Sequence, residues 1–153
     1  MTGEFAIAVH ALVYLNHKGC CLSSEELAKN VCTNPARIRM VMGKLKAAGL
    51  VATKEGSSGG YSFTGDPGAV TLLDVSEAVN ARFIGPAWRS GDMDMECLIA
   101  SGMANIMDGI YSDMEKQCRR HLRDITVGDI DGMIFKNKKT LTTQGDSIYF
   151  KVK

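Results

Sequence analysis

Apolar residues are dense in the first stretch of the chain, residues 3–19. They occupy the positions Phe5, Ile7, Ala8, Val9, Ala11, Leu12, Val13 and Leu15. A helix on a protein surface carries one apolar stripe, and this stretch holds more apolar residues than one stripe contains. We therefore expect a central helix that ends near Gly19 and is contacted from several sides.

Two helix starts follow in quick succession. Ser23 and Glu26 have the S-x-x-E spacing of a capping box, which predicts a short helix over about residues 24–30. Asn34 and Pro35 predict a second start, because asparagine caps exposed amides and proline suits the first helical position. Only a few residues separate the two helices, so their axes must meet at an angle. The apolar positions of the second helix are Ile38, Val41, Met42 and Leu45.

A β-hairpin is predicted directly behind the second helix. Gly49 suits the left-handed residue that ends that helix. The runs LVATKE and GYSFTG are strand-like, and the residues that join them are Gly56, Ser57, Ser58 and Gly59. A glycine loop that holds a phosphate opens a helix after a buried strand, whereas this loop leads into a strand. The sequence therefore favours a hairpin with a flexible tip.

One long apolar stripe dominates the second half of the chain. Thr71 and Asp74 predict a short capped helix, and residues 82–94 have the mixed Gly, Pro, Ser and Asp content of a connector. Between residues 95 and 125 apolar side chains recur at steps of three and four, at Ile99, Met103, Ile106, Ile110, Met114, Cys118, Leu122 and Ile125. Such a stripe favours packing against a long helix, which is its copy in a second chain, the first helix of its own chain, or both. ITVGDI then predicts a brief last helix.

Composition indicates a mostly helical protein. Hydrophobic residues make up 45% of the 153 residues and aromatic residues only 7%, a balance that favours helices. No apolar run approaches the roughly 20 residues of a membrane span, and the N-terminus lacks the layout of a secretory signal. We expect one compact unit with an appendage, in a soluble cytoplasmic protein.

The formal net charge of +1 conceals an uneven distribution of charge. Residues 27–54 contain no acid, and their cations are Lys29, Arg37, Arg39, Lys44, Lys46 and Lys54. The side of the second helix opposite its apolar positions carries Ala36, Met40, Gly43 and Ala47, with cations along both edges. Small residues permit a close approach, and the flanking cations suit the phosphates on the two walls of a major groove.

A short helix, a tight turn and a second helix with a basic outer face are typical of a helix-turn-helix. An amphipathic helix pair with solvated charges explains the helices equally well. It does not explain a hairpin directly behind the second helix, which is where a wing lies. The sequence therefore favours a winged helix-turn-helix over the helix pair.

Catalytic and metal-binding constellations are not evident in the sequence. The acids are scattered, and Cys118 and His121 share a helix face but supply only two ligands, although a dimer would supply four. Five irregularly spaced cysteines favour reduced thiols. Cys97 is the candidate redox sensor, because amides at a helix start lower the pKa of a thiol. We expect Cys32 in the core and the single tryptophan, Trp88, in a packing role rather than in an effector pocket.

The chain resembles the Rrf-two family of bacterial transcriptional regulators, which includes regulators of iron–sulfur cluster and cysteine metabolism. The resemblance lies in SSEELAKNVCTNPARIRMVMGKLKAAGLVATKEGSSGGYSF, VTLLDVSEAV and HLRDITVGDI, and covers roughly residues 4–131. Its most specific part is LKAAGLV followed by GSSGGY. The resemblance implies a winged helix-turn-helix domain, a long C-terminal dimerisation helix and binding to a palindromic operator.

Two features depart from the pattern of that family. Members often carry arginine before the first wing glycine, where this chain has Glu55, a residue that phosphates would repel. Lys54 would then take the place of that arginine, or the wing would contact DNA differently. Cluster-binding members have three closely spaced cysteines, whereas Cys97 stands alone here and Cys118 follows about six helical turns later. We therefore expect no cofactor, an iron–sulfur cluster included.

The sequence predicts a mainly α fold with a small β-wing, in four segments. They are a winged helix-turn-helix domain (1–81), a connector (82–94), a dimerisation helix with a short terminal helix (95–135), and a tail that has the alternation of a hairpin (136–153). The residues predicted to contact DNA are Asn34, Ala36, Arg37, Arg39, Met40, Lys44, Lys46, Lys54, Ser57, Ser58, Gly59, Gly60 and Tyr61. The residues predicted at the dimer interface are Ile99, Met103, Ile106, Ile110 and Met114.

The predicted function is that of a dimeric, sequence-specific DNA-binding regulator, a repressor rather than an enzyme, with a thiol-based or small-ligand signal. Its expected partners are double-stranded DNA with a palindromic operator and a second copy of the chain, and no membrane. The alternative is a winged-helix protein-interaction module that has lost DNA binding. Glu55 is the residue that favours this alternative.

Overall fold

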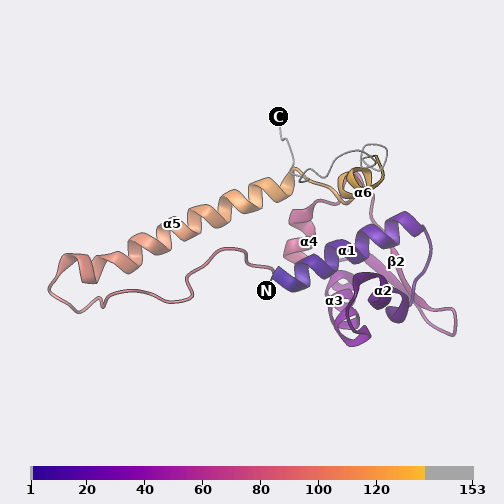
Figure 1. Cartoon of the computed structure of the whole chain (residues 1–153), viewed down its shortest axis with the longest axis horizontal. Helices are drawn as coiled ribbons and strands as arrows, with labels where there is room; N and C mark the ends of the chain where they lie inside the picture. The colour runs from indigo at the N-terminus through magenta and orange to yellow at the C-terminus, as the bar shows by residue number, and fades with distance from the viewer. Residues whose placement is uncertain (1, 137–153) are drawn as a thin grey trace, which may run out of the picture.

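The computed structural model describes residues 2–136, which form six helices and one two-stranded sheet. The elements are α1 (Thr2–Lys18), α2 (Ser24–Val31), α3 (Pro35–Ala47), β1 (Val51–Lys54), β2 (Gly60–Phe63), α4 (Leu72–Ala78), α5 (Leu98–Arg123) and α6 (Val127–Lys136). Figure 1 shows all of them gathered in one body except α5, which extends away from it. The predicted mainly α fold with a small β-wing is confirmed. The hairpin predicted in the tail lies outside the described residues.

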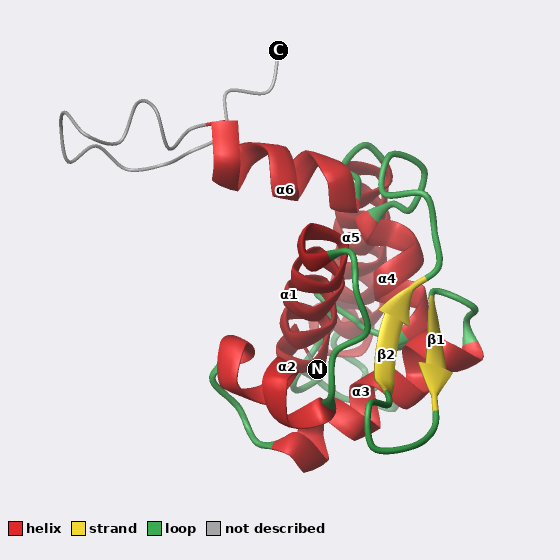
Figure 2. Cartoon of the chain, turned by 90° about the vertical axis from the view of Figure 1, so that its right-hand side faces the viewer, coloured by secondary structure: helices red, strands yellow, loops and turns green. Residues whose placement is uncertain are grey.

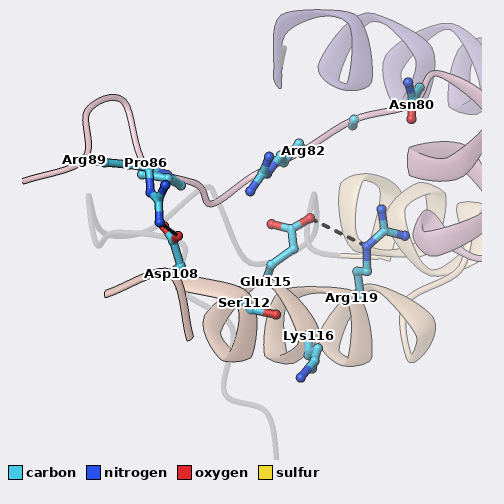
Figure 3. Close-up of a pocket in the computed structure, with 10 residues that line it drawn as sticks. Asn80, Arg82, Pro86, Arg89, Asp108, Ser112, Glu115, Lys116 and Arg119 are labelled. Atoms are coloured by element: carbon cyan, nitrogen blue, oxygen red, sulfur yellow. Dashed lines mark ion pairs between the residues drawn. The ribbon is translucent and has the colours of Figure 1, made fainter. Parts of the chain in front are cut away.

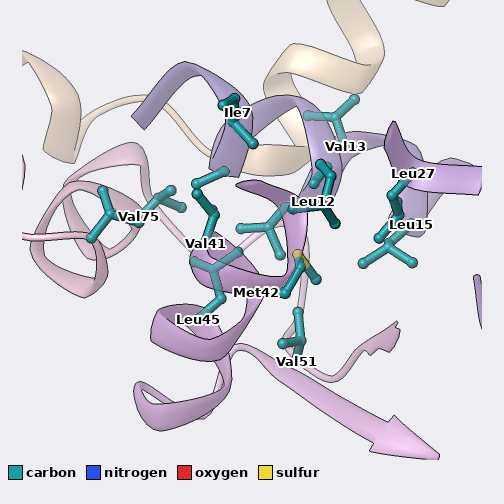
Figure 4. Packing of buried hydrophobic residues seen from close by; sticks show 14 of the residues in the cluster. Ile7, Leu12, Val13, Leu15, Leu27, Val41, Met42, Leu45, Val51 and Val75 are labelled. Atoms are coloured by element: carbon teal, nitrogen blue, oxygen red, sulfur yellow. The ribbon is translucent and has the colours of Figure 1, made fainter. Parts of the chain in front are cut away.

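Helix α1 is the centre of the body, as its apolar density predicts. Ala8, Ala11 and Leu12 have no exposed surface, and the helix contacts α2, α3, α4, α6 and β2. Figure 4 shows Leu12 and Met42 side by side in this core. Each fully buried aliphatic side chain contributes about 1.5–3 kcal/mol relative to an exposed one, so the body is stabilised mainly around α1. No helix within residues 2–136 is long and apolar enough to cross a membrane.

The turn between α2 and α3 is set by two caps and one left-handed residue. Ser23 and Glu26 form the predicted capping box at the start of α2, with the Ser23 amide 2.8 Å from the Glu26 carboxylate. Helix α2 ends at Val31, and the next residue, Cys32, caps it with a left-handed φ of 59°. The expectation that Cys32 lies in the core is wrong, because this residue forms the outer corner of the turn and its side chain is exposed. Asn34 then caps α3, its Oδ1 accepting a hydrogen bond from the Arg37 amide at 2.8 Å.

Helix α3 lies on the core with the predicted face. Its buried residues are Ile38, Val41, Met42 and Leu45. The helix ends before Gly49, whose φ is 76°, and the Leu50 amide donates back to the Leu45 carbonyl. The spacing of apolar residues therefore predicts both the helix and the side that it buries.

Strands β1 and β2 form the predicted hairpin beside α3 (Figure 2). The strands are antiparallel, and their register pairs Val51 with Phe63. Leu22, in the loop before α2, exchanges two backbone hydrogen bonds with Tyr61 and so joins the edge of β2. Gly60 is required there, since a Cβ on it would lie 2.2 Å from the Leu22 carbonyl oxygen and its φ is 153°. The hairpin is thus anchored to the helix-turn-helix at its base.

Helix α6 returns to the body after α5. The Leu72 amide donates to the Ile125 carbonyl, and the Val127 amide donates to the Val70 carbonyl. Val127 is fully buried in the core, and α6 packs against α1. The two ends of α5 therefore differ, because its C-terminal end is tied to the body while its N-terminal end lies far from it (Figure 1).

Helix α5 and the connector run antiparallel to each other. Glu115 accepts hydrogen bonds from the amides of Phe83 and Ile84, and the Asp92 amide donates to the Ala100 carbonyl nearer the outer end. Trp88, on this connector, is 78% exposed. The expectation that Trp88 packs within the chain is wrong, because the connector carries it along α5 beyond the reach of the core.

Candidate nucleic-acid interface

The outer face of α3 is open to solvent. Its exposed residues are Ala36, Arg37, Arg39, Met40, Gly43, Lys46 and Ala47. Met40, in the middle of this face, is 47% exposed, and a Cβ on Gly43 would meet no atom within 4 Å. The surface that the sequence analysis assigns to DNA is therefore accessible in this chain, and its contact with DNA stays a prediction.

Two of the predicted DNA-binding cations have acidic partners within the chain. Lys44 Nζ lies 2.5 Å from Glu4 Oε2 on α1, and the two side chains are only 38% and 23% exposed. The hydrogen bond from Lys44 holds the pKa of Glu4 below its ordinary value. Arg39 donates to Ser24 and, at 3.3 Å, to the exposed carboxylate of Glu25. Lys44 therefore joins α3 to α1, whereas Arg39 is held at the surface.

The other three predicted DNA-binding cations are not paired with acids of residues 2–136. They are Arg37, Lys46 and Lys54. Arg37 lies beside the start of α1, since a Cβ on Gly3 would be 3.6 Å from its Nη2. Lys46 is exposed in the last turn of α3, and Lys54 is the last residue of β1. Positive charge that can meet an external anion is thus present on both α3 and the wing.

The wing residues divide into an exposed tip and a base with a structural role. Ser57 and Ser58 are exposed, as is Glu55 before them. Gly59 and Gly60 face backbone atoms at distances that admit no side chain. Tyr61 is half-buried against the core. Three of the six predicted wing contacts, residues 59–61, therefore have a structural role that does not involve DNA.

The apolar stripe of α5 is exposed from Leu98 to Met114, whereas Cys118 and Leu122 near its C-terminal end are half-buried. Its exposed members are Leu98, Ile99, Met103, Ile106, Ile110 and Met114, and Leu98 reaches 86%. Sequence analysis missed Leu98, which is apolar and adjacent to the stripe but was placed inside a longer helix. Within residues 2–136, Ala104 is the only buried residue of α5, with 7% of its surface exposed. The exposed part of this stripe does not pack on the first helix of the same chain.

The Cys97 thiol is exposed at the N-cap position of α5. The backbone amide of Ala100, followed by that of Ile99, holds the pKa of this thiol below its ordinary value. The position is the one that the sequence analysis assigns to a redox sensor. Whether oxidant acts there stays a prediction.

An iron–sulfur cluster does not fit the described residues. Cys97 and Cys118 lie near opposite ends of α5, about 30 Å apart along the helix axis. No three His, Cys, Asp or Glu side chains within residues 2–136 are grouped so that they could hold a metal ion. Among the described residues of a single chain, these two cysteines therefore cannot ligate one cluster together.

Sequence analysis missed the acids that organise this surface. Glu4 lies on α1 and Glu25 on α2, and each contacts a cation of α3 from a distance of 14 or more positions in the chain. No local motif marks such a pair. The one available signal is the absence of acids from residues 27–54, which means that any partner for these cations must come from another segment.

Comparison with known proteins identifies the family of the chain that carries this surface. The model of the Rrf2 family, described as "Iron-dependent Transcriptional regulator", matches residues 1–131. YwgB of Bacillus subtilis, named an HTH-type transcriptional regulator, is 26% identical over 134 residues, which are 83% of this chain and 84% of YwgB. The crystal structure of a transcriptional regulator from Lactobacillus plantarum has a TM-score of 0.76 and 22% identity, over 93% of this chain and 97% of that one.

CymR, the global cysteine regulator of Bacillus subtilis, has the same fold with a TM-score of 0.64. It is 18% identical, over 87% of this chain and 96% of CymR. The resemblance noted in the sequence is thereby confirmed, since the family model spans the winged helix, the connector, α5 and the first half of α6. The chain belongs to the Rrf2 (Rrf-two) family of transcriptional regulators.

Proposed function

We propose that this chain is a dimeric, sequence-specific DNA-binding repressor that acts in the cytoplasm on a palindromic operator. In this proposal α3 enters the major groove and the wing of β1 and β2 lies against the neighbouring backbone. The observation that carries the proposal is the open outer face of α3, where Arg37 and Lys46 have no acidic partner among residues 2–136.

The side chains of α3 divide between the two tasks of DNA recognition. In this proposal the exposed residues Ala36, Arg37 and Met40 face base edges, and Lys46 faces phosphate. Arg39 can exchange Glu25 for a phosphate at low cost, because an exposed ion pair contributes only about 0–1 kcal/mol. Lys54 and the exposed serines of the wing add backbone contacts.

The apolar stripe of α5 supplies the dimer interface in this proposal. Ile99, Met103, Ile106, Ile110 and Met114 are exposed on one helix, and a stripe of this size on a protein surface marks an interface. Two copies related by a two-fold axis would bury the same stripe from both sides. The two α3 helices would then address half-sites about 34 Å apart.

The alternative, a winged-helix module that binds protein and not DNA, has one supporting observation. Glu55 is exposed at the wing, where its carboxylate would face the phosphate backbone. Under this alternative the cations of α3 are solvated and bind no nucleic acid.

Fluorescence anisotropy with genomic upstream fragments and with random DNA, each at two salt concentrations, separates the two functions. The proposal predicts a preferred fragment and an affinity that falls steeply with salt. Arg37→Ala should weaken binding by roughly tenfold or more and flatten the salt dependence. Arg123→Ala, with the same charge change on exposed α5, should leave both unchanged. Absence of any salt-sensitive binding would favour the protein-binding module.

Repression is measured separately, by transcription in vitro from a promoter that overlaps the preferred fragment. The proposal predicts fewer transcripts when the full chain is added. An increase in transcripts would mean that the protein activates transcription and does not repress it.

A further inference from the structure

A cavity of about 670 Å³ lies between the connector and α5 (Figure 3), and no residue of α3 or the wing lines it. Four cationic side chains line it: Arg82, Arg89, Lys116 and Arg119. Two carboxylates, Asp108 and Glu115, also line it, so cations are in excess. Its size is in the range of small-molecule sites, roughly 300–1,000 Å³. Nothing in the DNA-binding proposal uses these residues.

Three of the cations are already paired. Arg89 lies 2.7 Å from Asp108. Lys116 pairs with Asp113, and Arg119 lies between Glu77 and Glu115. These pairs neutralise much of the charge of the lining. The cavity therefore depends on its remaining cation to hold an anion.

Arg82 is the cation of this cavity without an acidic partner in residues 2–136. Its Nε donates to the Ile84 carbonyl at 3.2 Å, so its two terminal nitrogens remain available. A Cβ on Gly85 would lie 2.8 Å from the Arg82 Cζ, which means that the guanidinium rests directly on the backbone of this glycine. Figure 3 shows Arg82 directed from the connector toward Glu115. The guanidinium of this exposed side chain is thus held against the backbone of the connector, where it forms part of the cavity lining.

Glu115 holds the two walls of the cavity together. Its Oε2 accepts hydrogen bonds from the amides of Phe83 and Ile84, at 3.2 and 2.8 Å. Its side chain is 15% exposed, and its buried Oε1 has no hydrogen-bond partner among the described residues. Because these bonds join α5 to the connector, the cavity is formed before any ligand arrives.

The wall that carries Arg82 also contacts the DNA-binding body. Phe83, the residue after Arg82, packs its ring edge-on against Phe5 of α1, with 5.0 Å between the ring centroids. Phe5 follows Glu4, which holds Lys44 of α3. Neighbouring residues therefore connect the wall at Arg82 to α3.

We infer that this cavity is an effector site for a small organic carboxylate, which the Arg82 guanidinium binds through two parallel hydrogen bonds. A planar guanidinium with two free donors matches a carboxylate in geometry. Asp108 and Glu115 in the lining disfavour ligands of high negative charge such as polyphosphates. The effector role rests on the proposed DNA-binding function, whereas binding of the carboxylate at Arg82 does not depend on it.

Calorimetric titration of the full-length protein tests the binding itself. The probes are acetate, succinate, glutarate, citrate and inorganic phosphate, against sodium chloride of matched ionic strength. At least one carboxylate should bind saturably, and Arg82→Ala should weaken it by about tenfold or more. Arg82→Lys keeps the charge without the planar fork and should also weaken binding. Arg120→Ala, the same charge change on exposed α5 outside the cavity, should bind as wild type.

Failure of every carboxylate to bind wild type, tighter binding of phosphate than of any carboxylate, or equal binding by Arg82→Ala would overturn the assignment. The effector role is then measured as DNA affinity with and without the bound carboxylate, which should change in wild type and not in Arg82→Ala. Unchanged affinity would refute the effector role. Failure of the DNA-binding proposal appears separately, as absent DNA binding by the ligand-free protein.

Discussion

Glu4 of α1 and Lys44 of α3 form a hydrogen-bonded ion pair at 2.5 Å across 40 positions of sequence. The pair lies beneath the surface that we propose for DNA, and it directs a cation of that surface toward the core helix. It therefore has two opposed effects, since it ties α3 to α1 and it withholds Lys44 from phosphate.

Glu4→Gln should raise the affinity for DNA. The substitution removes a negative charge next to α3 and frees Lys44 to contact a phosphate. DNA binding should then release about one more counterion, which steepens the fall of the binding constant with salt concentration. Stability should fall by about 0–1 kcal/mol, because the pair is partly exposed. Anisotropy titrations at two salt concentrations measure the effect, with Glu96→Gln as the exposed control. Equal affinity of Glu4→Gln and wild type would contradict this expectation.

The same pair predicts a pH dependence. The Lys44 hydrogen bond lowers the pKa of Glu4 in the folded state below the ordinary value of 4.5. Its contribution to stability is therefore complete above pH 4.5 and is lost as the pH falls through the lowered pKa. Urea unfolding should show a difference between wild type and Glu4→Gln at pH 7 that disappears on acidification. A stability difference between the two proteins that persists in acid would mean that it does not come from the Glu4–Lys44 ion pair.

Asn34 combines a structural and a proposed DNA-binding role that two substitutions separate. Asn34→Ala removes the cap bonded to the Arg37 amide and should cost about 1 kcal/mol of unfolding free energy. Asn34→Asp keeps the cap and should retain stability within a few tenths of a kcal/mol. Its added charge should nevertheless weaken DNA binding. Undiminished DNA binding by Asn34→Asp would place this residue outside the DNA contact.

Gly60 should be intolerant of alanine. The substitution places a Cβ 2.2 Å from the Leu22 carbonyl at a φ of 153°, and strain of this kind costs about 1–3 kcal/mol. Gly43→Ala is the matched control, because its Cβ would meet nothing and helical alanine is better than glycine by about 0.5–1 kcal/mol. Urea unfolding should therefore shift in opposite directions for the two variants. Similar stability of both would mean that the wing base is loosely held.

Ile106→Glu should convert the proposed dimer to a monomer. Ile106 is 61% exposed in the single chain, so glutamate leaves the protomer intact but would place an unpaired charge in the two-fold interface. Sedimentation velocity measures the assembly, with exposed Gln117→Glu on the same helix as control. A wild type that sediments as a monomer at micromolar concentration, or a dimeric Ile106→Glu, would remove α5 as the interface.

Cys97 should react as a thiolate at lower pH than an ordinary cysteine. The amides of Ala100 and Ile99 lower its pKa, so its rate of alkylation by iodoacetamide should reach half its maximum below the usual thiol range. Mass spectrometry of the alkylated peptide gives this rate at each pH, and Cys97→Ser identifies the peptide. A midpoint in the ordinary range would remove Cys97 as the preferred site of oxidation.

The local elements of this protein follow from its sequence. The cap at Asn34, the apolar spacing of α3 and the density of α1 each depend on residues that are near neighbours in the chain, and each is found where predicted. The order of helix, turn, helix and hairpin then indicates the winged fold, because few architectures bury those faces together.

Tertiary structure alone decides which charges are free and which surfaces meet. Glu4 and Lys44 are 40 positions apart, and Glu115 bonds the connector from 31 and 32 positions away, so no local pattern relates them. The expectations for Cys32 and Trp88 are wrong for the same reason, since burial depends on what the rest of the chain brings alongside. Periodicity reports which face of an element is apolar, whereas only folding determines whether something covers that face.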